Sequence, residues 1–289
     1  MVLTPEEETG TEIKDKRNRF YRVIAIVSFF VFVIICGCNT IKNNNSTNMI
    51  TSAKNVLIVP EPYKMALQET QEQDYDKALR YLDLVIKDFP NNDEYIYRTY
   101  FLKSVINSEY INCDFKITGA LLDGLKDNVF IKLDERKRIL NDTQALLDEV
   151  KTFKTPFLES TTYILSNYDK FKKTDFSIVN SHDIKETSAT RAVDWFKDYK
   201  TPVPSNDELL VAKSDARKIL IGSCLDNVIQ EQKINYPTYF YMTSIIAYEW
   251  DKELSKKLLQ KVIEITEDDK YNKYRLDAED ALKNKFSGN

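Results

Sequence analysis

Histidine and glycine are both scarce in this 289-residue chain, which contains a single histidine, His182, and six glycines. One histidine excludes a metal site built from several imidazole rings. Strict alternation of apolar and polar residues, the pattern of a half-buried β-strand, is nearly absent. We therefore expect an all-α protein.

An excess of positive charge is also missing. The chain has 41 Lys and Arg residues against 45 Asp and Glu residues, which gives a net charge of −4. A nucleic-acid interface needs a basic patch or stripe. The composition therefore indicates no nucleic-acid partner.

Cysteine is limited to four residues, two of which, Cys36 and Cys38, lie close together near the N-terminus. The other two, Cys113 and Cys224, could form one disulfide in an oxidising compartment. Each lies in an apolar helical context, YINCDF or LIGSCLDNVI, where cysteine commonly packs as a small core residue. We expect two buried thiols.

The apolar run near the N-terminus is short for a transmembrane helix. It extends without a charge from Val23 to Ile35, whereas a membrane span needs about 20 residues. A basic segment precedes it, as in the signal peptides of exported proteins. The pattern predicts a signal peptide over residues 1–37. The basic residues are Lys14, Lys16, Arg17, Arg19 and Arg22.

The segment Ile35-Cys36-Gly37-Cys38 resembles the lipobox of bacterial lipoproteins. The resemblance implies that Cys38 receives a diacylglyceryl group, becomes the first mature residue and anchors the protein in the cell envelope, facing outside the cytoplasm. Residues 38–54 would then form a flexible tether, since they begin with a stretch rich in Asn, Ser and Thr. An uncleaved membrane anchor is the main alternative, and a buried core segment is another.

The segment QDYDKALRYLDLVIKDFPNN, residues 73–92, has apolar residues at three- and four-residue intervals, which predicts an amphipathic helix. Asp74 can cap its start, and Pro90 ends it because proline cannot donate a backbone hydrogen bond. The segment resembles the second helix of a tetratricopeptide repeat, and residues 62–71 resemble the first helix. The resemblance implies packing roles for Ala66, Tyr75, Ala78, Leu82, Val85 and Pro90.

One repeat cannot bury its apolar face alone, so neighbouring repeats are required. Residues 239–265 fit the same template loosely, and residues 93–110 resemble the first helix of another repeat. A helix is expected over residues 133–153, and another from Pro156. We expect a superhelical array of antiparallel helix pairs, irregular in its middle. It would comprise an N-terminal region, residues 55–175, and a C-terminal region, residues 176–289.

Two residue groups invite a catalytic interpretation. His182 lies between Ser181 and Asp183, but hydrolytic triads are assembled from distant positions. Glu159-Ser160 resembles the Glu-Ser pair of lytic transglycosylases, but no Gly-Leu-Met-Gln-like segment follows it. We expect no catalytic residue, no metal and no cofactor, and a cell-wall hydrolase is the enzymatic alternative.

Aromatic residues are abundant, with 17 Tyr and 15 Phe, and several lie between residues 236 and 250. Tetratricopeptide arrays bind partner segments in concave grooves, where tyrosine offers an apolar body and a polar tip. Tyr239, Tyr241 and Tyr248 are candidates for such a groove, or they fill gaps between helices. We expect a lipid-anchored, non-catalytic scaffold or adaptor that binds other envelope proteins or peptides. The alternative is a helical solute- or glycan-binding lipoprotein.

Overall fold

The computed structural model describes residues 59–127, 131–174, 176, 206–230, 232–269 and 272–286. These residues form eight helices and one two-stranded hairpin, so the expected all-α class is confirmed for the described part of the chain. None of these eight helices combines the length and apolar character that crossing a membrane requires. The expected signal peptide and tether, the lipidation site Cys38 and His182 lie outside the described residues.

Helices α2 (Glu61–Gln71) and α3 (Tyr75–Asp88) form a hairpin close to the expected boundaries. The Asp74 carboxylate accepts a hydrogen bond from the Lys77 backbone N–H at 3.2 Å and caps α3. Gln73 has a φ of 61° where the chain reverses between the helices. Pro90 follows the end of α3 and is exposed. The packing residues expected between the helices are at most 2% exposed: Ala66, Tyr75, Ala78, Leu82 and Val85.

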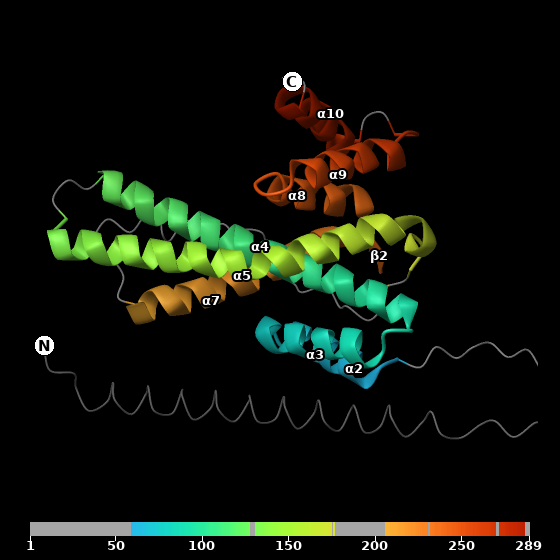
Figure 1. Cartoon of the computed structure of the whole chain (residues 1–289), viewed down its shortest axis with the longest axis horizontal. Helices are drawn as coiled ribbons and strands as arrows, with labels where there is room; N and C mark the ends of the chain where they lie inside the picture. Colours follow the sequence, from blue (N-terminus) through green and yellow to red (C-terminus); the bar gives the residue numbers. More distant parts are fainter. Residues whose placement is uncertain are drawn as a thin grey trace, which may run out of the picture. The chain divides into compact units, whose positions relative to one another are not determined.

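Helices α4 (Asp93–Asp127) and α5 (Leu133–Phe171) form a much longer hairpin, which crosses Figure 1. A tetratricopeptide repeat fits both of its helices into about 34 residues, whereas α4 alone has 35. The expectation that residues 93–110 form one repeat helix is wrong in its C-terminal boundary. No proline interrupts α4, and its buried apolar residues continue to Ile117 and Leu121.

Helix α5 continues through Pro156, where the sequence pattern suggested a new helix. An internal proline removes the hydrogen bond to the carbonyl four residues earlier. That carbonyl belongs to Thr152, which is exposed, so water can satisfy it. Beyond the proline, Phe157 is fully buried and Thr161 shares a hydrogen bond of 2.8 Å with Ser104 of α4. Packing on α4 therefore keeps α5 continuous.

Helix α7 (Asn206–Val228) packs along α4 and leads into β1 (Ile229–Gln230) and β2 (Lys233–Ile234). The two strands are antiparallel, with Ile229 opposite Ile234. The Phe176 N–H donates to the Gln232 carbonyl at 2.7 Å, and the Phe176 ring is buried against Phe101 of α4. Phe176 is thus joined both to this hairpin and to α4.

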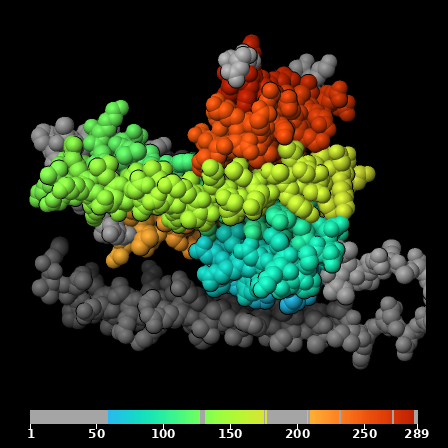
Figure 2. Space-filling model, viewed as in Figure 1, coloured from blue at the N-terminus to red at the C-terminus, as the bar shows by residue number. Residues whose placement is uncertain are grey.

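Helices α8 (Tyr236–Ala247), α9 (Lys252–Ile265) and α10 (Lys273–Phe286) pack in succession. Asn235 caps α8, and Asp251 caps α9 by accepting the Leu254 N–H at 2.8 Å. In the view of Figures 1 and 2, these helices (orange to red) lie on one side of the α4–α5 hairpin, and α2 and α3 (blue) lie on the other. The α8–α9 pair coincides with the second repeat-like segment.

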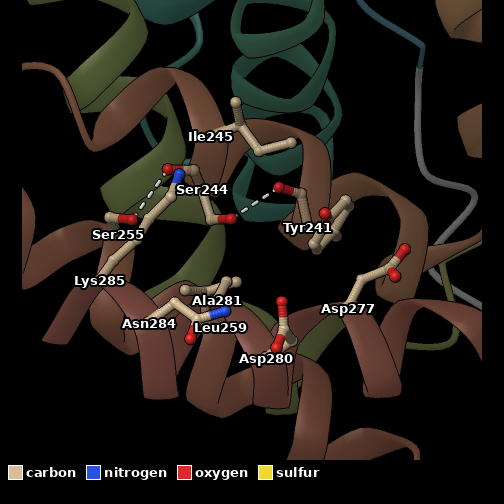
Figure 3. A pocket seen from close by; sticks show the side chains of 10 residues that line it. All are labelled: Tyr241, Ser244, Ile245, Ser255, Leu259, Asp277, Asp280, Ala281, Asn284 and Lys285. Carbon is tan, nitrogen blue, oxygen red and sulfur yellow. Dashed lines mark hydrogen bonds between the residues drawn. The ribbon is translucent and has the colours of Figure 1, made fainter. Parts of the chain in front are cut away.

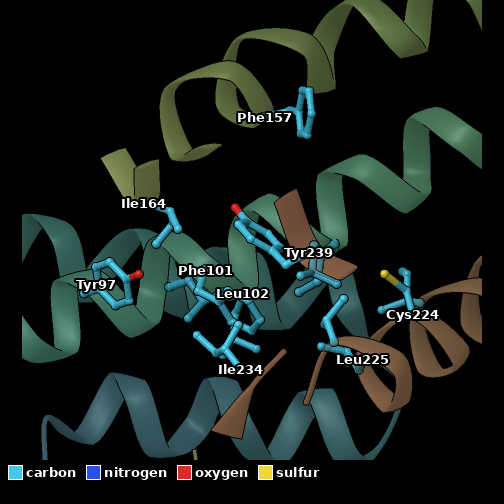
Figure 4. Packing of buried hydrophobic residues seen from close by; sticks show 14 of the residues in the cluster. Tyr97, Phe101, Leu102, Phe157, Ile164, Cys224, Leu225, Ile234 and Tyr239 are labelled. Carbon is cyan, nitrogen blue, oxygen red and sulfur yellow. The ribbon is translucent and has the colours of Figure 1, made fainter. Parts of the chain in front are cut away.

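The main core includes residues from α2, α3, α4, α5, α7, α8, α9 and α10. Figure 4 shows its centre, where Phe101 of α4, Ile164 of α5, Leu225 of α7 and Tyr239 of α8 gather. The two regions expected on either side of residue 175 therefore share one core. A smaller cluster lies among α4, α5 and α7: Cys113, Ile117, Leu121, Ile139, Leu146 and Ala216.

The two cysteines in the described residues are both free and buried, which confirms the expectation of two thiols. Cys113 belongs to the smaller cluster and Cys224 to the main core. Burial raises the pKa of the Cys113 thiol to about 12, with the negative charge of Asp114 as a secondary cause. Burial also raises the pKa of Cys224 well above its ordinary value. Both residues therefore act as core residues.

Candidate binding groove

A groove of about 270 Å³ is formed by helices α8, α9 and α10 and is shown in Figure 3. Helix α8 contributes Tyr241, Ser244 and Ile245, and helix α9 contributes Ser255 and Leu259. The other lining residues come from α10. Three consecutive helices thus build the site, and two of them form the second repeat-like pair.

Two serines allow α8 and α9 to approach closely at the base of the groove. The Ser244 hydroxyl donates to the Tyr241 carbonyl at 2.6 Å, and the Ser255 hydroxyl donates to the Ser244 carbonyl at 2.9 Å. These hydroxyls are therefore satisfied within the protein. Ile245 is 48% exposed, and the Tyr241 ring is half-buried. The α8 surface offered to a ligand is mainly apolar.

Helix α10 supplies a charged edge. Asp277, Asp280 and Asn284 are spaced by three and four residues, so they share one helical face. Burial raises the pKa of the Tyr241 hydroxyl, and the negative charges of Asp277 and Asp280 contribute to the increase. The Tyr241 ring also contacts the Tyr274 ring, with centroids 5.6 Å apart. The groove combines an apolar surface with two carboxylates.

Tyr248 lies at the end of α8 and is connected to the groove through Lys285. Its ring packs edge-on against Phe286, with centroids 5.5 Å apart. The ammonium groups of Lys252 and Lys285 lie 5.4 Å and 4.6 Å from the centre of the same ring. Lys285 also lines the groove. Tyr248 therefore orients a groove residue without lining the groove itself.

Tyr239 does not line the groove, and its burial corrects the prediction that it is a groove residue. Its side chain is 1% exposed, and its hydroxyl donates to the Ser104 hydroxyl of α4 at 2.9 Å. Tyr239 and Tyr241 are two positions apart on a helix, so their side chains point in different directions. One faces α4 and the other faces α10.

The α10 residues of the groove did not emerge from the sequence pattern. Asp277, Asp280 and Asn284 occupy one face of a strongly polar helix, which reads as an ordinary solvated surface. The sequence feature that indicates packing of α10 on its neighbours is the pair Ala278 and Ala281, because small side chains let two helices approach closely. Ala278 is fully buried, and Ala281 lines the groove.

The Glu159-Ser160 pair does not form a common site. Glu159 is exposed, whereas Ser160 is 1% exposed and faces the core. Adjacent residues of a helix differ by about 100° in direction, which explains the separation. No cluster of three or more potential His, Cys, Asp or Glu metal ligands occurs in the described part of the chain.

Comparison with models of protein families found no match to this chain. Comparisons with curated proteins and with solved structures also found no match. The functional interpretation therefore depends on the residues of the groove and on the sequence motifs.

Proposed function

We propose that this protein is a lipid-anchored, non-catalytic adaptor outside the cytoplasm, and that the α8–α10 groove binds a segment of another envelope protein. The observation that carries the proposal is the combination of Tyr241 and Ile245 with the carboxylates of Asp277 and Asp280 in one groove. The anchor is inferred from the lipobox-like segment that ends at Cys38.

The size of the groove favours a protein segment over a free solute. Binding sites for small molecules commonly have volumes of about 300 to 1,000 Å³ and bury most of the ligand. The groove, at about 270 Å³, lies at the lower limit of that range. It accommodates a side chain or two from a segment that lies across it.

The charges of the groove favour a partner segment that carries Lys or Arg beside an apolar residue. Asp277 and Asp280 would attract the cationic group, while Tyr241 and Ile245 would contact the apolar side chain and the stem of the basic one. Complementary charge contributes mainly to specificity and to the rate of association. We infer that reversing the two acidic charges weakens binding by about tenfold.

The repeat-like pairs α2–α3 and α8–α9 support the scaffold role. Helix pairs of this kind offer extended surfaces to partner segments. In the proposed superhelical array, the α4–α5 hairpin is the irregular middle, and it shares one core with both pairs. The protein would thus keep its partner near the membrane, within the reach of the expected tether.

The test is site-specific photocross-linking in intact cells. A photoreactive residue replaces Ile245 in the groove, and a control chain carries it at Leu84 on α3, which is 38% exposed. We expect Ile245 to yield a discrete adduct with one envelope protein and Leu84 to yield none. The adduct should decrease by about tenfold when Asp277→Lys and Asp280→Lys are introduced together.

A matched charge control separates groove binding from general electrostatics. Asp88→Lys with Asp123→Lys changes the net charge by the same amount at two exposed positions outside the groove. This variant should retain the adduct. An adduct that is insensitive to the groove substitutions would contradict the proposed site.

The anchor is tested by metabolic labelling with a palmitate analogue. The parent chain should be labelled, and Cys38→Ala should not, because the acyl chains depend on modification of that thiol. Cys36→Ala is the control, since it leaves the modified residue in place. Equal labelling of Cys38→Ala and the parent would reject the lipid anchor.

A further inference from the structure

A larger cleft, of about 500 Å³, lies between the α2–α3 turn and helix α7, with Tyr110 of α4 also lining it. It shares no residue with the α8–α10 groove. The two sides of the cleft carry opposite charges. The α2–α3 side contributes Glu72, Asp74 and Asp76, and the α7 side contributes Lys213, Arg217 and Lys218.

The cationic side is held in place by two other helices. The Arg217 guanidinium donates to both carboxylate oxygens of Asp114 on α4, at 2.9 and 2.8 Å, and to Glu149 on α5 at 2.9 Å. It also lies 4.3 Å from the centre of the Tyr110 ring. Lys213 donates to Glu149 at 2.6 Å. These contacts fix the positions of the Arg217 and Lys213 side chains in the absence of a ligand.

Two donors on the α7 side have no acceptor within the described residues. The Arg217 Nε atom is buried without a hydrogen-bond partner. Lys218 forms no ion pair with any residue that the structure describes, and Ser214 lies one helical turn before it in the lining. Lys218 therefore has an unpaired charge that is available to a negatively charged group in the cleft.

The acidic side is shaped by the left-handed turn at Gln73, where φ is 61°. Asp76, in the first turn of α3, accepts the Tyr110 hydroxyl at 2.8 Å, which orients its carboxylate. Tyr75 also lines the cleft and is 2% exposed, and its hydroxyl has no hydrogen-bond partner in the described residues.

We propose that this cleft binds a short zwitterionic peptide, with its terminal ammonium beside Glu72 and Asp76 and its terminal carboxylate beside Lys218. A purely anionic ligand would be repelled by the carboxylates on the α2–α3 side. A purely cationic ligand would be repelled by the basic side chains of α7. Only a ligand with both charges matches both sides. The assignment goes beyond the adaptor function and does not depend on it.

The size of the cleft sets the length of the peptide. Its volume lies within the range of about 300 to 1,000 Å³ that is typical of small-molecule sites. An extended peptide spans about 3.5 Å per residue. A peptide of about two to four residues, about 7 to 14 Å long when extended, is therefore the size of ligand that we infer for this cleft.

The first test is calorimetric titration of the full-length chain in detergent with trialanine, N-acetyl-trialanine and trialanine amide. The acetylated peptide lacks the ammonium, and the amide lacks the carboxylate. We expect saturable binding of trialanine and at least about tenfold weaker binding of each capped peptide, as expected for loss of one charged hydrogen bond. Equal binding of the capped peptides, or no saturable binding of trialanine, overturns the proposal.

The second test uses variants of the same chain. Lys218→Ala and Asp76→Asn should each weaken trialanine binding, and the asparagine retains an acceptor for Tyr110. The controls Lys87→Ala and Asp88→Asn change exposed residues at the other end of α3 and should bind normally. Unchanged binding by both cleft variants rejects the site. Asp277→Lys, which changes the α8–α10 groove and not the cleft, should leave trialanine binding intact. Failure of the peptide site and failure of the adaptor function can therefore be distinguished.

Discussion

Leu82 and Leu84 lie two positions apart on α3 and have opposite environments. Leu82 is fully buried between helices, whereas Leu84 is 38% exposed. Removing a buried leucine loses its transfer free energy and leaves a cavity. The same change at a half-exposed position loses little, because the side chain already contacts water. The pair therefore isolates the contribution of packing in the repeat-like hairpin.

We predict that Leu82→Ala lowers the free energy of unfolding by about 2 to 5 kcal/mol. Leu84→Ala should change it by no more than about 0.5 kcal/mol. Urea unfolding of both variants, followed by circular dichroism, measures the difference. Similar losses in the two variants would mean that Leu82 does not pack in the core as described.

Asp114 is fully buried on α4 and forms an ion pair with Arg217 of α7. Burial raises the pKa of Asp114 to about 6, although the charges of Arg217 and Lys213 act against this and that of Glu149 adds to it. The folded protein therefore takes up a proton at a higher pH than the unfolded chain does. By linkage, this single group makes the folded state more stable as the pH falls from about 6 towards 4.

Asp114→Asn removes that titration. As the pH falls from about 7 to 4.5, we predict that the free energy of unfolding of the parent chain increases relative to this variant by on the order of 2 kcal/mol. Urea unfolding at several pH values measures this difference. A difference that is constant over this range would show that Asp114 does not titrate there.

Glu149 is expected to change the stability with pH in the opposite direction to Asp114. Burial acts to raise its pKa, but hydrogen bonding from Lys213 and the charge of Arg217 hold that pKa below its ordinary value. Its contribution to stability is therefore present at neutral pH and is lost as the pH falls through its folded-state pKa. The stability deficit of Glu149→Gln should shrink on acidification.

Among the helices, α5 shows how packing overrides a local signal. It continues through Pro156, although proline in a helix interior costs about 3 kcal/mol relative to alanine. Pro156→Ala should therefore raise the free energy of unfolding by about 1 to 2 kcal/mol, less than the full amount because proline also restricts the unfolded chain. Thermal and urea unfolding measure the change.

Thr155→Ala, at the exposed neighbouring position, is the control for the proline substitution and should change stability by less than about 0.5 kcal/mol. If Pro156→Ala lowers stability instead, the backbone around the proline makes a specific contribution to the packing of α5 on α4. That outcome would contradict the account given for the continuous helix.

The boundaries of α2 and α3 were predictable because they are marked locally. Asp74 caps α3, Pro90 follows its end, and the apolar positions recur with a helical period. The boundaries of α4 and α5 were not predictable in the same way. Helix length beyond residue 110 depends on whether a partner helix runs alongside, and no local feature of the sequence reports that.

In the molecule as a whole, one core joins segments from Tyr63 to Ala278. The Phe115 ring of α4 stacks on Trp250, which follows α8, with centroids 5.8 Å apart. Trp250 therefore reports on the contact between the long hairpin and the C-terminal helices. Because α4 and α5 run through both apolar clusters, we expect the described regions to unfold together.

The prediction is tested in a Trp195→Phe background, where Trp250 is the only tryptophan. Urea transitions followed by Trp250 fluorescence and by far-ultraviolet circular dichroism should coincide. Addition of Leu82→Ala, far from Trp250 in sequence, should shift both transitions equally. Two separate midpoints would show that the C-terminal helices form an independent unit.

Local pattern was sufficient for the helical class, for the α2–α3 pair and for the two buried thiols, because periodicity, caps and apolar context act within a few residues. It was not sufficient for the groove. Helix α8, YPTYFYMTSIIA, is apolar on nearly all sides, so the pattern cannot tell Tyr239 from Tyr241. Their different environments arise because α4 covers one side of α8, while α10 leaves a groove beside the other.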